Sequence, residues 1–131
     1  MLLVDDEPSI LRGLSGLLRG RGYEVLTAQT GDAAFRIAGE QYVDVAVIDF
    51  HIPSWRGDVV LAAMAASQPH LNRQTVFMTG DIGDTVRDIS ARTGCPLLIK
   101  PFDVEDLDWH ILRLMHDRTH RPPKDQGANG V

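Results

Sequence analysis

The sequence predicts an α/β fold, a doubly wound parallel sheet of five strands covered by five helices. Two observations support this prediction. Five short apolar runs, mostly of β-branched or aliphatic residues, alternate with segments whose apolar residues recur at helical spacing. Strands covered on both faces are typically such continuous runs, and consecutive βα units build a parallel sheet with helices on both faces. A length of 131 residues with a hydrophobic share of 44% suits one domain with a substantial core.

The expected strands are short and end where polar residues begin. They are rich in valine, isoleucine and leucine, as strands buried on both faces are. In chain order they cover residues 2–4, 24–28, 45–48, 75–78 and 97–99.

The first two expected helices follow the first and second strands. Pro8 and Gly22 bound the first helix, because proline is favoured in the first turn of a helix and glycine just past its end. Thr30 is the expected N-cap of the second. Their apolar residues recur at intervals of three and four: Ile10, Leu11, Leu14, Leu17 and Leu18 in the first, Ala34, Ile37 and Ala38 in the second.

Three further helices are expected after the remaining strands. The third covers residues 58–66 and stops before Pro69, the fourth ends near Gly94, and the fifth starts after Asp103 as its N-cap. Their inward stripes are Ile82, Val86 and Ile89 in the fourth, and Leu107, Ile111, Leu114 and Met115 in the fifth. Because the end of the chain has little to bury, we expect a domain at residues 1–118 and a flexible C-terminal tail at 119–131.

Composition and charge argue against several classes of protein. A net charge of -5 does not suit a general nucleic-acid binder, which needs a basic face to neutralise phosphates. Cys95 is the only cysteine, so an internal disulfide and a cysteine-based zinc site are excluded, and a reducing compartment fits. No apolar run reaches membrane-spanning length, and acids follow the N-terminal MLLV at once, unlike in a signal peptide. We therefore expect a cytoplasmic protein that binds neither nucleic acid directly nor a membrane.

Polar side chains follow four of the five expected strands. Asp5 and Asp6 follow the first, Asp49 the third, Thr79 the fourth and Lys100 the fifth. In a parallel sheet these positions meet at one edge, where such sheets bind ligands. Three carboxylates there would repel one another unless a cation lay among them, and oxygen ligands of this kind suit Mg²⁺. The hydroxyl and the ammonium would complete a cradle for a phosphoryl group, with one carboxylate placed as nucleophile.

Four motifs carry a resemblance to a known family. LLVDDEPSI, VIDFHIPSWRG, FMTG and IKPF, each at the end of its own expected strand, together resemble the receiver domain of two-component response regulators over residues 1–115. The resemblance implies a flavodoxin-like fold with strand order 2-1-3-4-5. It also implies a phosphorelay function in bacterial signal transduction, in which a histidine kinase or a histidine phosphotransfer protein donates a phosphoryl group. Such a domain is a signalling module and catalyses only its own phosphorylation and dephosphorylation.

The same resemblance implies roles for individual residues. Asp49 would be the phosphoacceptor, forming an aspartyl phosphate. Mg²⁺ would be bound by Asp6 directly, by Asp5 mainly through a water molecule, by Asp49 itself, and by His51 through its backbone carbonyl. Thr79 would bind a phosphoryl oxygen and move toward it on activation.

Lys100 would pair with the phosphoryl group, or with the unmodified acceptor. Its peptide bond to Pro101 is expected to be cis, a state almost confined to bonds before proline. Leu97 stands at the second switch position, where the family commonly has an aromatic residue. His51 and Asp81 stand at positions that influence the lifetime of the acyl phosphate.

Two other functions are considered beside this one. A pseudo-receiver, an interaction module that is never phosphorylated, stays open because Leu97 departs from the family pattern. A haloacid-dehalogenase-like phosphatase using Asp49 as nucleophile is disfavoured, because it needs a second acid where His51 stands.

Two exposed-looking aromatic residues raise the question of partners. Trp55 either packs on the third helix or contacts a partner, and packing is the favoured interpretation. Trp109, Leu112 and His116 form a second apolar stripe on the fifth helix, opposite its core stripe. We hypothesise that this stripe, with the fourth helix and the fifth strand, forms the output or homodimer face.

Overall fold

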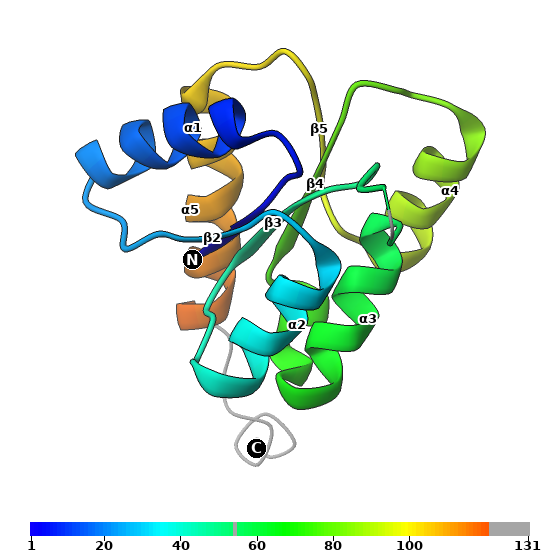
Figure 1. Ribbon diagram of the computed structural model, residues 1–131, viewed down its shortest axis with the longest axis horizontal. Helices are drawn as coiled ribbons and strands as arrows, with labels where there is room; N and C mark the ends of the chain where they lie inside the picture. Colours follow the sequence, from blue (N-terminus) through cyan, green and yellow to red (C-terminus); the bar gives the residue numbers. More distant parts are fainter. Residues whose placement is uncertain (54, 121–131) are drawn as a thin grey trace.

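The computed structural model describes residues 1–53 and 55–120, and its centre is one parallel sheet. The five strands lie in the order β2-β1-β3-β4-β5 (Figure 1). Their bounds are β1 Leu2–Val4, β2 Leu26–Ala28, β3 Ala46–Asp49, β4 Thr75–Thr79 and β5 Leu97–Ile99. This sheet order, together with the helices described next, confirms the predicted flavodoxin-like α/β fold.

Helices cover both faces of the sheet in the described part of the chain. They are α1 Pro8–Gly20, α2 Gly31–Glu40, α3 Gly57–Ser67, α4 Asp84–Thr93 and α5 Val104–His120, with a short 3₁₀ helix, η1, at Pro69–Arg73. Figure 1 shows α1 and α5 on one side of the sheet and α2, α3 and α4 on the other. The 3₁₀ turn was not predicted from sequence; it begins at the proline that was expected to stop the third helix.

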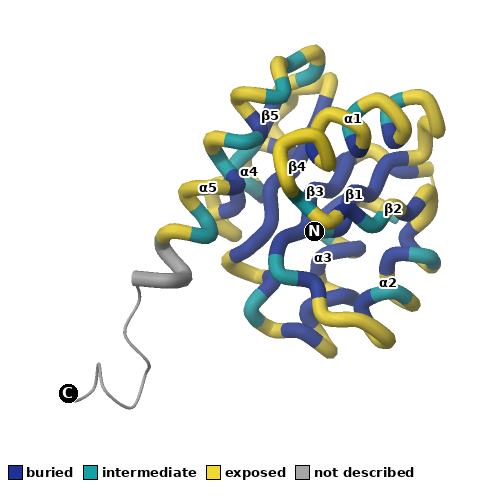
Figure 2. Tube along the Cα trace, turned by 90° about the vertical axis from the view of Figure 1, so that its left-hand side faces the viewer, coloured by how far each residue is buried: buried dark blue, intermediate teal, exposed yellow. Residues whose placement is uncertain are grey.

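Alternate side chains of each strand feed two separate cores. Leu3 and Val47 pack with apolar residues of α1 and α5, whereas Leu2 and Ile48 pack with those of α2, α3 and α4. The three central strands β1, β3 and β4 are accordingly buried throughout, while β2 and β5 at the edges of the sheet and the outer surfaces of the helices contain exposed residues (Figure 2). Continuous apolar runs were therefore the right signature of these strands.

Strand register brings the ends of the strands to one edge. Val4 pairs with Ile48, Asp49 with Met78, and Thr79 with Ile99. We call the carboxyl ends of β1, β3, β4 and β5, with the loops that follow them, the rim. The residues that follow these strands consequently face the same region of the molecule.

Three details differ from the sequence-based expectations. The fourth helix begins at Asp84 rather than including Ile82, whose side chain is 48% exposed. A carboxylate oxygen of Asp81 accepts the backbone N–H of Gly83 and so forms a turn before the helix, which explains the later start. The second strand is shorter than expected, because its pairing with β1 starts at Leu26. On α1, Leu17 is exposed although it belongs to the predicted apolar pattern.

Other expected caps agree with the structure. The hydroxyl of Thr30 accepts the N–H of Ala33, which makes it the N-cap of α2. Gly94 ends α4 in the left-handed conformation, with φ of 76°, where glycine is favoured.

The end of the chain leaves the domain boundary a prediction. Helix α5 continues to His120, and the remainder of the predicted tail, residues 121–131, lies outside the described residues. Within residues 1–53 and 55–120, no helix combines the length and the apolar character needed to cross a membrane.

Candidate functional site

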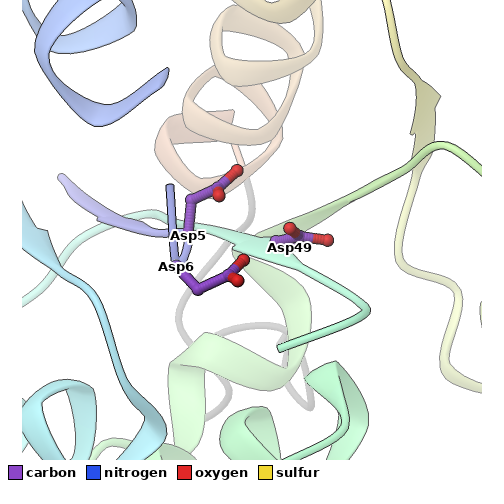
Figure 3. Close-up of side chains that lie close together, drawn as sticks. All are labelled: Asp5, Asp6 and Asp49. Atoms are coloured by element: carbon purple, nitrogen blue, oxygen red, sulfur yellow. The ribbon is translucent and has the colours of Figure 1, made fainter. Parts of the chain in front are cut away.

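Three aspartates gather at the rim. Asp5 and Asp6 follow β1, Asp49 is the last residue of β3, and one oxygen from each lies within 4.8 Å of the others (Figure 3). Asp5 is 0% exposed and Asp49 is 6% exposed, whereas Asp6 is open to solvent. Buried carboxylates are costly unless they are paired or bind a cation, so this cluster requires partners.

Lys100 is the partner of the two buried acids. It follows β5, and its Nζ atom lies 2.8 Å from Oδ2 of Asp5 and 3.1 Å from Oδ2 of Asp49. Sequence reasoning named only Asp49 as a protein partner of this lysine, and the contact with Asp5 was missed. The convergence of strand ends could have suggested it, but the choice of rotamer could not be read from the sequence.

The pKa of Lys100 reflects both burial and these acids. Burial is the largest single influence and would lower the pKa by disfavouring the ammonium. Hydrogen bonds and charge attraction from Asp5 and Asp49 together outweigh it, so the pKa is raised above its usual value. The lysine therefore stays charged at neutral pH.

Each buried carboxylate is also held by a nearby backbone N–H. Oδ1 of Asp5 accepts the N–H of Glu7 at 2.9 Å, and Oδ1 of Asp49 accepts the N–H of His51 at 3.0 Å. Both are turns in which aspartate bonds the backbone two residues on, a local preference of this residue type. In each acid the second oxygen is thereby directed to Lys100.

The charges at the rim do not balance, and this imbalance fits a divalent cation. Three carboxylates face one ammonium, which leaves two formal negative charges. Two oxygens bound to one Mg²⁺ can be at most about 4.2 Å apart, twice its usual bond length. Since the carboxylate oxygens lie within 4.8 Å of one another, the set suits Mg²⁺ after a small rotation, or with one acid acting through water.

Thr79 lies at the rim but its hydroxyl is already engaged. The residue is 0% exposed, and its Oγ1 donates to the carbonyl of Asp81 at 2.8 Å and accepts the N–H of the same residue at 3.0 Å. Above this turn, a carboxylate oxygen of Asp81 lies 3.9 Å from Nε2 of His51, forming an ion pair when the imidazole is protonated. The two loops that follow β3 and β4 are thus linked at the surface.

The loop that follows β3 is a tight hairpin closed by a glycine. The N–H of Gly57 donates to the carbonyl of Phe50 at 2.8 Å, and His51 pairs with Arg56 in antiparallel fashion. A Cβ atom on Gly57 would lie 2.8 Å from the Cα atom of Phe50, too close for any side chain. Sequence reasoning missed this positioning role, although the glycine ends the quoted motif VIDFHIPSWRG.

The other predicted residues lie as follows. The peptide bond between Lys100 and Pro101 is cis. Leu97 is half-buried in β5 and packs on the core that includes Phe77, its pairing partner in β4. Trp55 is half-buried and packs on the same core, which supports the packing interpretation.

The stripe on α5 lies apart from the rim. Trp109 is 54% exposed and Leu112 is 56% exposed, and the guanidinium carbon of Arg113 lies 4.9 Å from the centre of the Trp109 ring. His116 is exposed on the same helix. Trp109 and Leu112 thus expose apolar surface on the side of α5 away from the core.

Known proteins are similar to this chain in sequence and in fold. The transcriptional regulatory protein KdpE of Mycobacterium tuberculosis is 45% identical over 108 residues, which cover 81% of this chain and 46% of the relative. The chain spans about half the length of these curated relatives.

Among solved structures, a response regulator receiver domain protein from Clostridium thermocellum is 30% identical, with a TM-score of 0.78 over 90% of this chain and 94% of that one. The response regulator TrrA of Thermotoga maritima, solved in complex with Mg²⁺ and BeF, is 25% identical, with a TM-score of 0.75 over 86% of this chain and 96% of that one. The sequence model of the response regulator receiver domain matches residues 1–112. The chain therefore belongs to the family of response regulator receiver domains.

Proposed function

We propose that this domain accepts a phosphoryl group from phosphohistidine onto Asp49 with the help of Mg²⁺, and that phosphorylation switches its contacts with other proteins. The observation that carries the proposal is the shared ammonium of Lys100 between two buried acids, beside a surplus of two negative charges. A complex with Mg²⁺ and BeF is known for the similar protein TrrA, which supports the same ligand class here.

The residues divide the chemistry among them. A carboxylate oxygen of Asp49 attacks phosphorus, the bond from phosphorus to the donor's histidine nitrogen breaks, and the electron pair stays on the imidazole. Asp5, Asp6, Asp49 and the backbone carbonyl of His51 would hold Mg²⁺, which would supply positive charge to neutralise the phosphoryl oxygens. Lys100 moves from the acceptor carboxylate to a phosphoryl oxygen, keeping a charge-assisted hydrogen bond throughout.

Activation would then depend on the turn at Thr79. Its hydroxyl leaves the backbone of Asp81 to bind a phosphoryl oxygen, and the loop that follows β4 shifts with it. Leu97 stands where the family commonly has an aromatic switch residue, and it would respond to the shift of this loop only through its packing contacts. We propose that the change reaches the exposed face formed by α4, β5 and α5, including Trp109 and Leu112, where a partner or a second copy binds.

The partners follow from the reaction. A histidine kinase or a histidine phosphotransfer protein supplies the phosphoryl group, and the reaction takes place in the cytoplasm. A net charge of -5 does not favour direct binding to nucleic acid, so we propose that the output of the domain passes through protein contacts.

Intact mass measurement after incubation with acetyl phosphate and Mg²⁺ tests this function. We expect one phosphoryl adduct on the wild type, none on Asp49→Asn, and an unchanged adduct on Asp88→Asn, a matched control in an exposed pair on α4. The adduct should disappear when Mg²⁺ is chelated. Absence of any adduct on the wild type, with acetyl phosphate and with a phosphorylated histidine kinase, would instead support the pseudo-receiver.

A further inference from the structure

We propose that Trp55 is a positioning residue for the metal, because its ring over Gly31 holds the loop that follows β3 against the segment that follows β2. This inference rests on the proposed function, since it concerns the Mg²⁺ site. It adds a residue outside the set of proposed ligands and gives a glycine of α2 a role in metal binding.

The contact between the two residues is close. A Cβ atom built on Gly31 would lie 2.6 Å from both Cγ and Cδ2 of the indole and 2.9 Å from Cε3. Carbon atoms in good contact are about 3.5 to 4.0 Å apart. The ring therefore lies directly over the glycine, with no room for a methyl group. Gly31 is buried and Trp55 half-buried, so the contact is shielded from solvent on one side.

On one side of this contact is the hairpin that follows β3. Its base is closed by the bond from Gly57 to Phe50, and His51 on one arm pairs with Arg56 on the other. Trp55 is the residue next to Arg56, so a displacement of the ring is transmitted across the pairing to His51. The N–H of His51 anchors Asp49, and its carbonyl is a proposed metal ligand.

On the other side is the segment between β2 and α2. The carbonyl of Ala28, the last residue of β2, accepts the N–H of Asp5 at 3.1 Å. Two residues later Thr30 caps α2 through the N–H of Ala33, which fixes the first helical turn at Gly31. The segment that carries Gly31 is thus bonded to the backbone of an acid of the cluster.

The Trp55–Gly31 contact therefore joins the loop that carries His51 to the segment that is bonded to the backbone of Asp5. Mg²⁺ requires near-ideal octahedral geometry, and the carboxylate oxygens, within 4.8 Å of one another, must already rotate slightly or use a water to share one ion. A loosened contact should lower the affinity for Mg²⁺ before it unfolds the domain.

Calorimetric titration of metal-free protein with Mg²⁺ tests this role. We expect Gly31→Ala and Trp55→Leu each to raise the dissociation constant by about 10-fold, the scale seen for residues that orient metal ligands. The double variant should bind Mg²⁺ as tightly as Trp55→Leu alone, because the leucine at position 55 leaves room for the methyl group of the alanine at position 31. Trp55→Phe keeps a ring on the glycine and should bind as the wild type does. Gly39→Ala on the same helix, where nothing lies within 4 Å of the added atom, is the matched control.

A second readout does not involve the metal. In metal-free protein the amide hydrogen of His51 should exchange faster in both single variants than in the wild type and in Gly39→Ala, because its bond to Asp49 is held less firmly. Gly31→Ala and Trp55→Leu disturb the contact from opposite sides, so either one decides the question if the other does not fold.

The outcomes separate the two proposals. If the variants bind Mg²⁺ as tightly as the wild type while only their unfolding temperatures fall, the contact is merely structural and the inference is overturned, with the proposed function intact. If the wild type itself binds no Mg²⁺, the proposed function fails and the inference fails with it. Weaker binding in the single variants, with normal binding in Trp55→Phe and Gly39→Ala, supports the inference.

Discussion

The rim and the α1–α5 side of the molecule both join distant segments through charged side chains, but in opposite ways. We use "α1–α5 side" for α1, the turn after it and α5. There, Arg21 bonds Glu105 at 2.9 Å and Asp108 at 3.0 Å, and the hydroxyl of Tyr23 donates to Asp108. One guanidinium serves both acids here too, but Asp108 has a second donor in Tyr23, and both acids contact water, since 69% of the Glu105 side chain and 18% of the Asp108 side chain are exposed.

At the rim the two buried acids have fewer side-chain partners and less contact with water. One ammonium serves two acids that are nearly or fully buried, and a third acid lies beside them. Buried carboxylates that outnumber their cations destabilise a fold in the absence of a ligand. Their presence therefore indicates a site that is completed by a bound cation. The difference teaches that the burial of the acids, rather than the number of acids that share one cation, separates a candidate site from a structural ion pair.

The largest expected effect comes from removing the shared cation. Lys100→Met leaves Asp5 and Asp49 close together without a positive partner, and should lower the free energy of unfolding by about 3 kcal/mol in the presence of a chelator. Mg²⁺ should restore more stability to this variant than it adds to the wild type, because it supplies the missing charge. Urea denaturation with a chelator and with Mg²⁺ measures both effects.

The matched change on the α1–α5 side is Arg21→Met. Its ion pairs are partly exposed, so we expect a loss of about 1 kcal/mol or less, with no dependence on Mg²⁺. Equal losses in the two variants, or a Mg²⁺ response in both, would contradict the distinction drawn between the two regions.

A second difference between the regions lies in how tightly the backbone is packed. Gly57→Ala places a methyl carbon 2.8 Å from the Cα atom of Phe50, so the hairpin that follows β3 must shift. We expect a loss of about 2 kcal/mol, within the range for overpacked cores, measured by urea denaturation. A variant as stable as the wild type would mean that this loop adapts freely and does not hold its residues in place.

The rim could be predicted from sequence because parallel strands place their carboxyl ends at one edge. The acids after β1 and β3 and the lysine after β5 were expected to converge for this reason alone, and they lie within bonding distance in the structure. The contacts that depend on rotamers could not be predicted. These include the bond from Lys100 to Asp5 and the turn that engages the hydroxyl of Thr79.

Errors on the helices have a similar physical origin. Ile82 was assigned to the fourth helix by periodicity, but the turn made by Asp81 ends before Asp84 and leaves the isoleucine exposed. Periodicity reports which face of a regular element is apolar, whereas side-chain bonds to the backbone decide where the element starts. The packing of Trp55 on Gly31 joins segments far apart in sequence. Neither hydrophobic periodicity nor local bonds from side chains to the backbone predict such a contact.

High pH tests the tie on the α1–α5 side. Burial, together with the hydrogen bond to Asp108 and its charge, raises the pKa of Tyr23 to about 12 from 10.0, against a smaller lowering by Arg21. Because the folded state keeps the phenol proton more tightly, its stabilising effect is present below pH 10 and is lost as pH rises toward 12. The raised pKa of Lys100 adds a loss of stability in the same direction at alkaline pH.

Replacement of the tyrosine separates the two contributions. Tyr23→Phe should cost about 1 kcal/mol at neutral pH, the value of one hydrogen bond. The free energy of unfolding should then fall less steeply with pH between 10 and 12 than in the wild type, leaving the share due to Lys100. Urea denaturation at a series of pH values measures the slope. An unchanged slope would mean that Tyr23 has the same pKa in the folded and the unfolded protein.

The smallest expected effect is a gain, and it tests whether the α1–α5 side is as unconstrained as it looks. Gly16 lies inside α1 with an exposed surface, and nothing lies within 4 Å of a Cβ atom built on it. Alanine there removes the entropic cost of a helical glycine, so Gly16→Ala should stabilise the domain by about 0.5 to 1 kcal/mol, with the affinity for Mg²⁺ unchanged. The same substitution at Gly57 is expected to destabilise the domain. The sign of the effect therefore distinguishes a closely packed backbone at the rim from an open helix surface on the α1–α5 side. A loss of stability at both glycines would remove that contrast and with it the claim that close packing is concentrated at the rim.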